Sequence, residues 1–75
     1  MTQEKVNILL FKTNIQSILD KQRIQECFDN NEQINQWNID LQDVDCVLRI
    51  VSETLTTAEI ISAVEQMGFD CTELE

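Results

Sequence analysis

The amino-acid sequence predicts an α+β fold in which two helices pack on one face of a four-stranded antiparallel sheet. Three observations favour this fold class. Four short runs rich in β-branched, aromatic or other apolar residues are separated by polar turns, and two further segments carry the start signals of a helix. These segments follow one another in the order β-α-β-β-α-β. No linker or repeat divides the sequence, so we expect residues 1–75 to form a single domain.

The first half of the chain predicts a central strand followed by a helix. Residues 5–13 are too short for a good helix and are apolar on both faces, as in a strand with neighbours on both sides. Ser17, with Asp20 three residues later, has the form of a capping box and predicts that a helix begins there. The predicted apolar face of this helix comprises Ile18, Leu19, Ile24, Cys27 and Phe28. Asn30 and Asn31, which tolerate turn conformations, predict its end.

The middle of the chain predicts a hairpin. Residues 37–41 alternate strictly, with Trp37, Ile39 and Leu41 on one face, which is typical of a half-buried strand. A polar turn at residues 42–45 then leads to a second β-rich run at residues 46–51.

The last third predicts a second helix and a short final strand. Thr56 and Glu59 make another capping box, and Gly68 stands where a helix commonly ends. Residues 71–74 form the last strand. A single β-α-β-β-α-β unit of this kind predicts a ferredoxin-like sandwich, with strand order 4-1-3-2 when the strands are numbered along the chain.

Composition excludes several classes of function. The chain has 14 acidic and 5 basic residues, a formal charge of -9, and such a protein repels nucleic-acid phosphates. The longest apolar run, Ile8 to Phe11, is far shorter than the roughly 20 residues of a membrane span, and Met1 to Lys5 is unlike a secretory signal. Histidine is absent and glycine occurs once, so we see no catalytic constellation. We therefore expect a cytoplasmic protein that is not an enzyme, holds no cofactor and binds neither nucleic acid nor membrane.

Several segments resemble the heavy-metal-associated domain, a family that includes copper chaperones and the N-terminal modules of metal-transporting P-type ATPases. The resemblance runs from about Lys5 to Leu74 and is most specific in the second half. It is carried by Trp37-x-Ile-Asp40, by the Leu55-Thr-x-x-Glu-Ile-Ile61 helix start and by Met67-Gly-Phe69.

The resemblance implies a degenerate member without the metal loop of the family. The family holds Cu(I) with two thiolates of a C-x-x-C loop between the first strand and the first helix, because soft metals prefer sulfur. Here those two positions are Ser17 and Asp20, and the bulky Ile18 and Leu19 stand between them. We therefore expect that the soft-metal site is lost.

The cysteines leave an alternative open. Cys27, Cys46 and Cys71 are odd in number and form no C-x-x-C spacing, so we expect three buried apolar side chains. The predicted topology nevertheless places Cys46 and Cys71 on opposite sides of the first strand, too far apart for a disulfide. In this alternative the chain is a Cu or Zn carrier or sensor whose relocated ligands are Cys46 or Cys71 with Asp20. The acidic residues Asp40, Asp43 and Asp45 are interpreted as a solvated turn, since they lack the ligand count of a calcium loop.

The open face of the sheet is the remaining candidate site. If the inward positions of the strands face the helices, pleat alternation places Ile8, Leu10, Val47 and Val51 on the opposite face. Such a patch can mark an interaction site, whereas scattered surface aliphatics need no function. Our first interpretation is a protein-interaction or dimerisation module that binds a protein partner or a second copy through this face.

Overall fold

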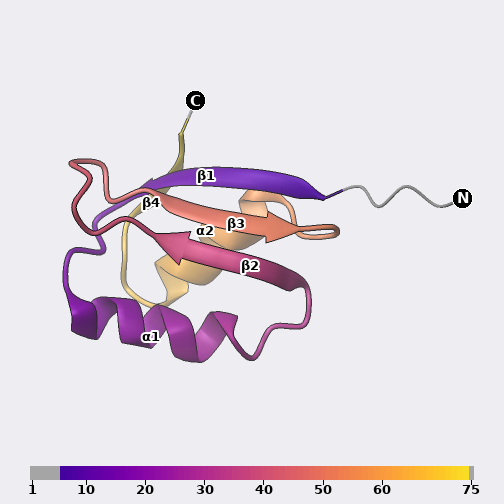
Figure 1. Ribbon diagram of the computed structural model, residues 1–75, viewed down its shortest axis with the longest axis horizontal. Helices are drawn as coiled ribbons and strands as arrows, with labels where there is room; N and C mark the ends of the chain where they lie inside the picture. Colours follow the sequence, from indigo (N-terminus) through magenta and orange to yellow (C-terminus); the bar gives the residue numbers. More distant parts are fainter. Residues whose placement is uncertain (1–5, 75) are drawn as a thin grey trace, which may run out of the picture.

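A computed structural model describes residues 6–74 of the chain (Figure 1). It contains β1 (Asn7–Thr13), α1 (Ile18–Phe28), β2 (Ile34–Ile39), β3 (Leu48–Ser52), α2 (Thr57–Gln66) and β4 (Cys71–Glu73). The predicted α+β class, with a four-stranded antiparallel sheet and two helices, is confirmed. Some bounds differ from the prediction: β2 begins at Ile34 and ends at Ile39, and Cys46 precedes β3. Lys5, predicted to begin the first strand, lies outside the described residues.

The strands are arranged in the order β2-β3-β1-β4, which from the other edge is 4-1-3-2. Every neighbouring pair is antiparallel. β1 therefore has a partner on each side, and Phe11 pairs with Leu48 of β3 and with Glu73 of β4. β2 and β4 are the two edge strands.

One buried cluster connects the sheet to both helices. Alternate strand residues, such as Phe11, Leu48 and Ile50, are fully buried, as expected for the inner face of a pleated sheet. Ile24 of α1 and Val64 of α2 belong to the same cluster. Figure 1 shows α2 behind the sheet and α1 running along the β2 side.

The predicted apolar face of α1 is partly wrong. Ile24 and Phe28 are buried, but Ile18 is 68% exposed, Leu19 is 73% exposed, and Cys27 is also exposed. An α-helix has about 3.6 residues per turn, so Ile24 and Phe28 lie one above the other on the core side. The other three residues lie off this narrow stripe and face outward. The helix thus buries two of these five apolar side chains.

The signals of α2 are confirmed. The Thr56 hydroxyl accepts the Glu59 N–H at 3.2 Å, and the Glu59 carboxylate accepts the Thr56 N–H at 3.3 Å, which completes the capping box. Gly68, with φ of 94°, follows the helix in the left-handed region that favours glycine.

Candidate functional site

The loop between β1 and α1 holds the positions where the resembled family places its metal ligands. The Ser17 hydroxyl caps α1 and accepts the Asp20 N–H at 3.1 Å. Asp20 lies in the first helical turn, where the helix dipole favours a carboxylate. The side chains of both residues offer hard oxygen donors, and the Ser17 hydroxyl is engaged in the helix cap, so the residues present do not fit a soft-metal ion.

Two cysteines lie on either side of the C-terminal end of β1. Cys71 pairs with Thr13 in the β1–β4 ladder, and the Cys46 carbonyl accepts the Thr13 hydroxyl at 2.7 Å. Both cysteines are buried as predicted, whereas the prediction that Cys27 is buried is wrong. None of the three forms a disulfide.

The electrostatics of Cys71 favour its neutral thiol. Burial, and secondarily the Glu65 carboxylate, raise the pKa of Cys71 from 9.0 to about 11. Because the thiolate is the form that binds metal, this environment works against the relocated-ligand alternative. Among residues 6–74, no group of three His, Cys, Asp or Glu side chains is placed to hold a metal ion.

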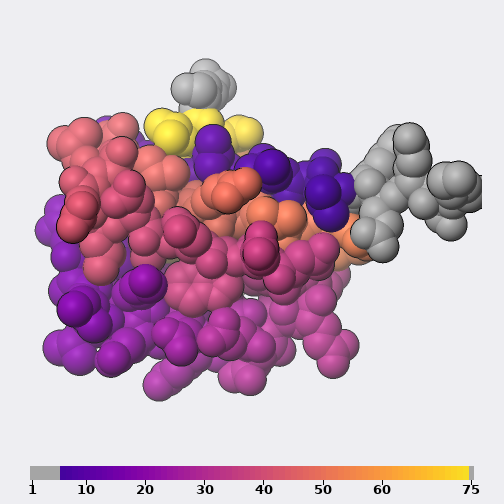
Figure 2. All heavy atoms as spheres, viewed as in Figure 1, coloured from indigo at the N-terminus to yellow at the C-terminus, as the bar shows by residue number. Residues whose placement is uncertain are grey.

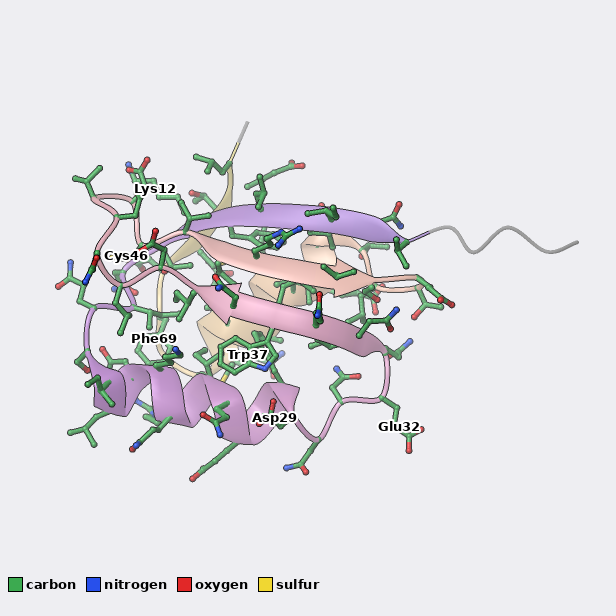
Figure 3. The ribbon with its side chains drawn as sticks, viewed as in Figure 1. Lys12, Asp29, Glu32, Trp37, Cys46 and Phe69 are labelled. Atoms are coloured by element: carbon green, nitrogen blue, oxygen red, sulfur yellow. The ribbon has the colours of Figure 1, made fainter. Side chains whose placement is uncertain are left out.

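The acidic residues between β2 and β3 organise their own turn. An Asp40 carboxylate oxygen accepts the Gln42 N–H at 3.0 Å, and one of Asp43 accepts the Asp45 N–H at 2.7 Å. Asp45 also forms an ion pair with Lys12 at 3.5 Å. Figure 3 shows Lys12 and Cys46 at this same end of the sheet. The carboxylates of Asp40 and Asp43 therefore act as turn-forming groups, as their spacing suggests, whereas that of Asp45 pairs with Lys12.

The open face of the sheet carries the predicted aliphatic residues. Ile8 is 54% exposed and pairs with the half-buried Val51 across β1 and β3. Leu10 is 38% exposed. Val47 is half-buried and precedes β3, and its carbonyl accepts the Asp40 N–H at 3.0 Å. Val47 thus lies at one end of this face, outside the regular strand.

Sequence reasoning missed one contributor, Leu74. Its N–H donates to the Leu10 carbonyl at 2.9 Å, which extends the β1–β4 ladder by one residue beyond Glu73. Leu74 is half-buried and follows Thr72 at the strand period of two, so it lies beside Leu10 on the open face. The alternation of side chains along residues 71–74 was the sequence signal that could have placed Leu74 on this face. We name Ile8, Leu10, Val51 and Leu74 the open-face patch.

The charges around the open-face patch differ from those of the whole chain. The other outward strand positions are Lys12, Gln36, Asn38, Arg49 and Thr72. No carboxylate projects from the described strands on this face, although the chain carries a net charge of -9. A shallow hollow beside the patch is lined by Gln36, Trp37, Asn38, Arg49 and Val51. Figure 2 shows β1, β3 and β2 forming one continuous surface in this region.

Comparisons with known proteins leave the function open. A scan against protein-family models and searches of the curated proteins and of the solved structures find no match. Within residues 6–74, no helix has the length and apolar character needed to cross a membrane.

Proposed function

We propose that this chain is a non-enzymatic protein-interaction domain that binds a protein partner, or a second copy of itself, through the open-face patch. In this proposal the fold is ferredoxin-like, and the chain is a cytoplasmic, degenerate relative of the heavy-metal-associated domains. It has lost the soft-metal site and retains the scaffold.

The observation that supports this proposal is the composition of the open face. A bare sheet face is normally polar, yet here Ile8 and Leu10 are exposed on the central strand and lie beside Val51 and Leu74. Arg49 and Lys12 are the only charged residues projecting from the described strands on this face. Lys12 already pairs with Asp45, so Arg49 is the cation that these strands offer beside the apolar centre, and this arrangement fits an apolar protein surface bordered by a carboxylate.

The alternative of a metal carrier has weaker support. Its thiols are buried, and the pKa of Cys71 is raised to about 11. Its other ligand, Asp20, lies in the first turn of α1 and offers a hard carboxylate oxygen, which suits a soft-metal ion poorly.

Replacing one patch residue by an acid tests the proposal. Leu10→Glu places a carboxylate in the centre of the patch and should abolish an interaction made there. Val44→Glu is the matched control, because Val44 is 94% exposed in the β2–β3 loop and the change in charge is the same. Sedimentation velocity over a concentration series measures self-association, and far-ultraviolet circular dichroism checks that both variants fold.

The possible outcomes separate a second copy from another partner. Self-association of the wild type and of Val44→Glu, with a monomeric Leu10→Glu, supports dimerisation through the patch. If the wild type is monomeric, the three proteins serve as baits in a lysate of the source cells. A protein retained by the wild type and Val44→Glu but not by Leu10→Glu then supports the proposal, whereas equal behaviour of all three baits contradicts it.

A further inference from the structure

The outer edge of β2 has backbone groups that point away from the sheet. Ile39 pairs with Leu48, and the Asp40 N–H donates to the Val47 carbonyl at 3.0 Å. In an antiparallel ladder, hydrogen-bonded pairs of residues alternate with pairs that are not hydrogen-bonded. Asp40 and Val47 form a hydrogen-bonded pair, so Asn38 and Gln36 also direct their backbone N–H and C=O groups towards β3. The N–H and C=O groups of Trp37 and Ile39 therefore face the outer edge.

This edge lacks two of the usual features that prevent strand pairing, a charged residue and a proline. Natural edge strands carry charges or proline, are very short, or are distorted by bulges. Residues 33–39 contain neither charge nor proline, in a chain with 25% charged residues. A bulge occurs between Ile34 and Gln36, but it leaves Gln36 to Ile39 regular. The opposite edge strand, β4, has only 3 residues and carries Glu73.

Trp37 is held in place at this edge. Its ring contacts Phe28 edge to face, with centroids 5.7 Å apart, and its indole N–H donates to the Asp29 carboxylate at 2.9 Å. Figure 3 shows the ring in the opening between β2 and α1, with Asp29 nearby. The ring remains half-buried, so part of its apolar surface would be covered by a neighbouring strand.

We propose that β2 pairs antiparallel with β2 of a second copy, with the two Trp37 residues directly opposite each other. The strand is self-complementary in this register. Gln36 of one chain stands opposite Asn38 of the other, so amides meet amides and no like charges are opposed. The two Trp37 residues exchange backbone hydrogen bonds, and their rings lie on the helix side of the joined sheet.

Two properties of this contact set its strength. A single pair of strands covers less surface than stable dimers bury, so association should be weak and visible only at high concentration. Both copies carry a charge of -9, so added salt should strengthen the association by screening their repulsion.

Variants that carry opposite charges on the β2 edge test this pairing. Gln36→Lys/Asn38→Lys and Gln36→Glu/Asn38→Glu each place like charges opposite one another, and their mixture places opposite charges there. The lysine variant also lowers the net negative charge, so any loss of association cannot come from greater overall repulsion. Sedimentation is measured from about 10 µM to about 1 mM, the range of weak complexes. The emission of Trp37, the single tryptophan, reports its burial, and circular dichroism confirms folding.

We expect the wild type to dimerise with a blue shift of Trp37 emission as its concentration rises. Each edge variant alone should associate about tenfold more weakly or not at all, and the equimolar mixture should restore the dimer. Leu10→Glu should retain edge pairing. A wild type that stays monomeric throughout the range overturns the proposal.

Other results separate this inference from the open-face proposal. Self-association that is lost in Leu10→Glu but persists in both edge variants contradicts edge pairing and supports dimerisation through the open-face patch. Failure of the mixture to restore the dimer also contradicts edge pairing. A dimer that is lost in the edge variants but kept in Leu10→Glu supports this inference. The bait experiment then tests whether the open-face patch binds another protein.

Discussion

Thr13 is the residue that ties the end of β1 to the loop between β2 and β3. Its hydroxyl donates to the Cys46 carbonyl at 2.7 Å and accepts the Ile15 N–H at 3.2 Å, and its own N–H donates to the Asp45 carbonyl at 3.1 Å. Cys46 has φ of 45°, a left-handed conformation that is unfavourable for a residue with a side chain. The bond from Thr13 helps to hold that conformation.

Replacing this hydroxyl by a methyl group should be costly. Thr13→Val has nearly the same volume but leaves the Cys46 carbonyl and the Ile15 N–H without their partner in a buried site. We expect the free energy of unfolding to fall by about 1–3 kcal/mol, as measured by urea denaturation. Thr72→Val is the control, since Thr72 is exposed and should change stability by less than about 0.5 kcal/mol. Equal effects of the two variants would contradict the role given to Thr13.

Cys71 should make stability depend on alkaline pH. The pKa of its thiol is 9.0 when unperturbed and about 11 in the folded chain, because of burial and then the Glu65 carboxylate. The unfolded chain therefore loses this proton at lower pH than the folded chain. The contribution of the neutral Cys71 thiol to the free energy of unfolding is complete below about pH 9 and is lost as the pH rises towards about 11.

The matching measurement is urea denaturation of the wild type and Cys71→Ala between these two pH values. The wild type should lose up to about 2–3 kcal/mol more than the variant over this interval, since one pKa unit corresponds to about 1.4 kcal/mol. Every other side chain is the same in the two proteins, so the comparison isolates the effect of Cys71. Parallel pH profiles would show that the pKa of Cys71 is not raised.

At the scale of elements, the two helices begin with the same kind of signal but have different anchors. α2 has a reciprocal capping box and buries Ile60 and Val64, whereas at α1 the Ser17 hydroxyl alone accepts the N–H of Asp20. We expect Thr56→Ala to lower the free energy of unfolding by about 1 kcal/mol, within the usual range of about 0.5–2 kcal/mol for caps.

Ser17→Ala should cost less than Thr56→Ala in the same denaturation experiment. The Ser17 cap includes one side-chain bond, and the first turn that it holds carries exposed Ile18 and Leu19. A larger effect for Ser17→Ala would indicate that the first turn of α1 has a structural role beyond its cap.

The elements also show where sequence reasoning succeeds. The capping residues, Gly68 and the alternation of Trp37 and Ile39 act locally, so short patterns located α2 and the middle of β2. The burial of α1 depends on how the helix lies against the sheet. Five apolar side chains therefore predicted a face of which only Ile24 and Phe28 are buried.

For the whole molecule, the order of elements and pleat alternation were sufficient to predict the sheet and the open-face residues Ile8, Leu10 and Val51. Leu74 lies in the predicted last strand, but its place beside Leu10, which is 64 residues away in the chain, depends on the register of the two strands. The predicted strand order 4-1-3-2 also placed the second strand at an edge of the sheet, but which of its backbone groups point outward depends on its register with β3. The function of both surfaces remains a prediction that the experiments above test.

The central place of β1 has a consequence for synthesis on the ribosome. β1 is made first, but its two neighbours, β3 and β4, are made much later. Until Leu48–Ser52 and then Cys71–Glu73 have emerged, the strand with the sequence Asn7–Thr13 has unpaired backbone on one or both sides. Long-range pairing of this kind forms slowly and leaves apolar segments accessible. During synthesis β1 therefore stays without its neighbouring strands, and the sheet is completed only when β4 has left the exit tunnel.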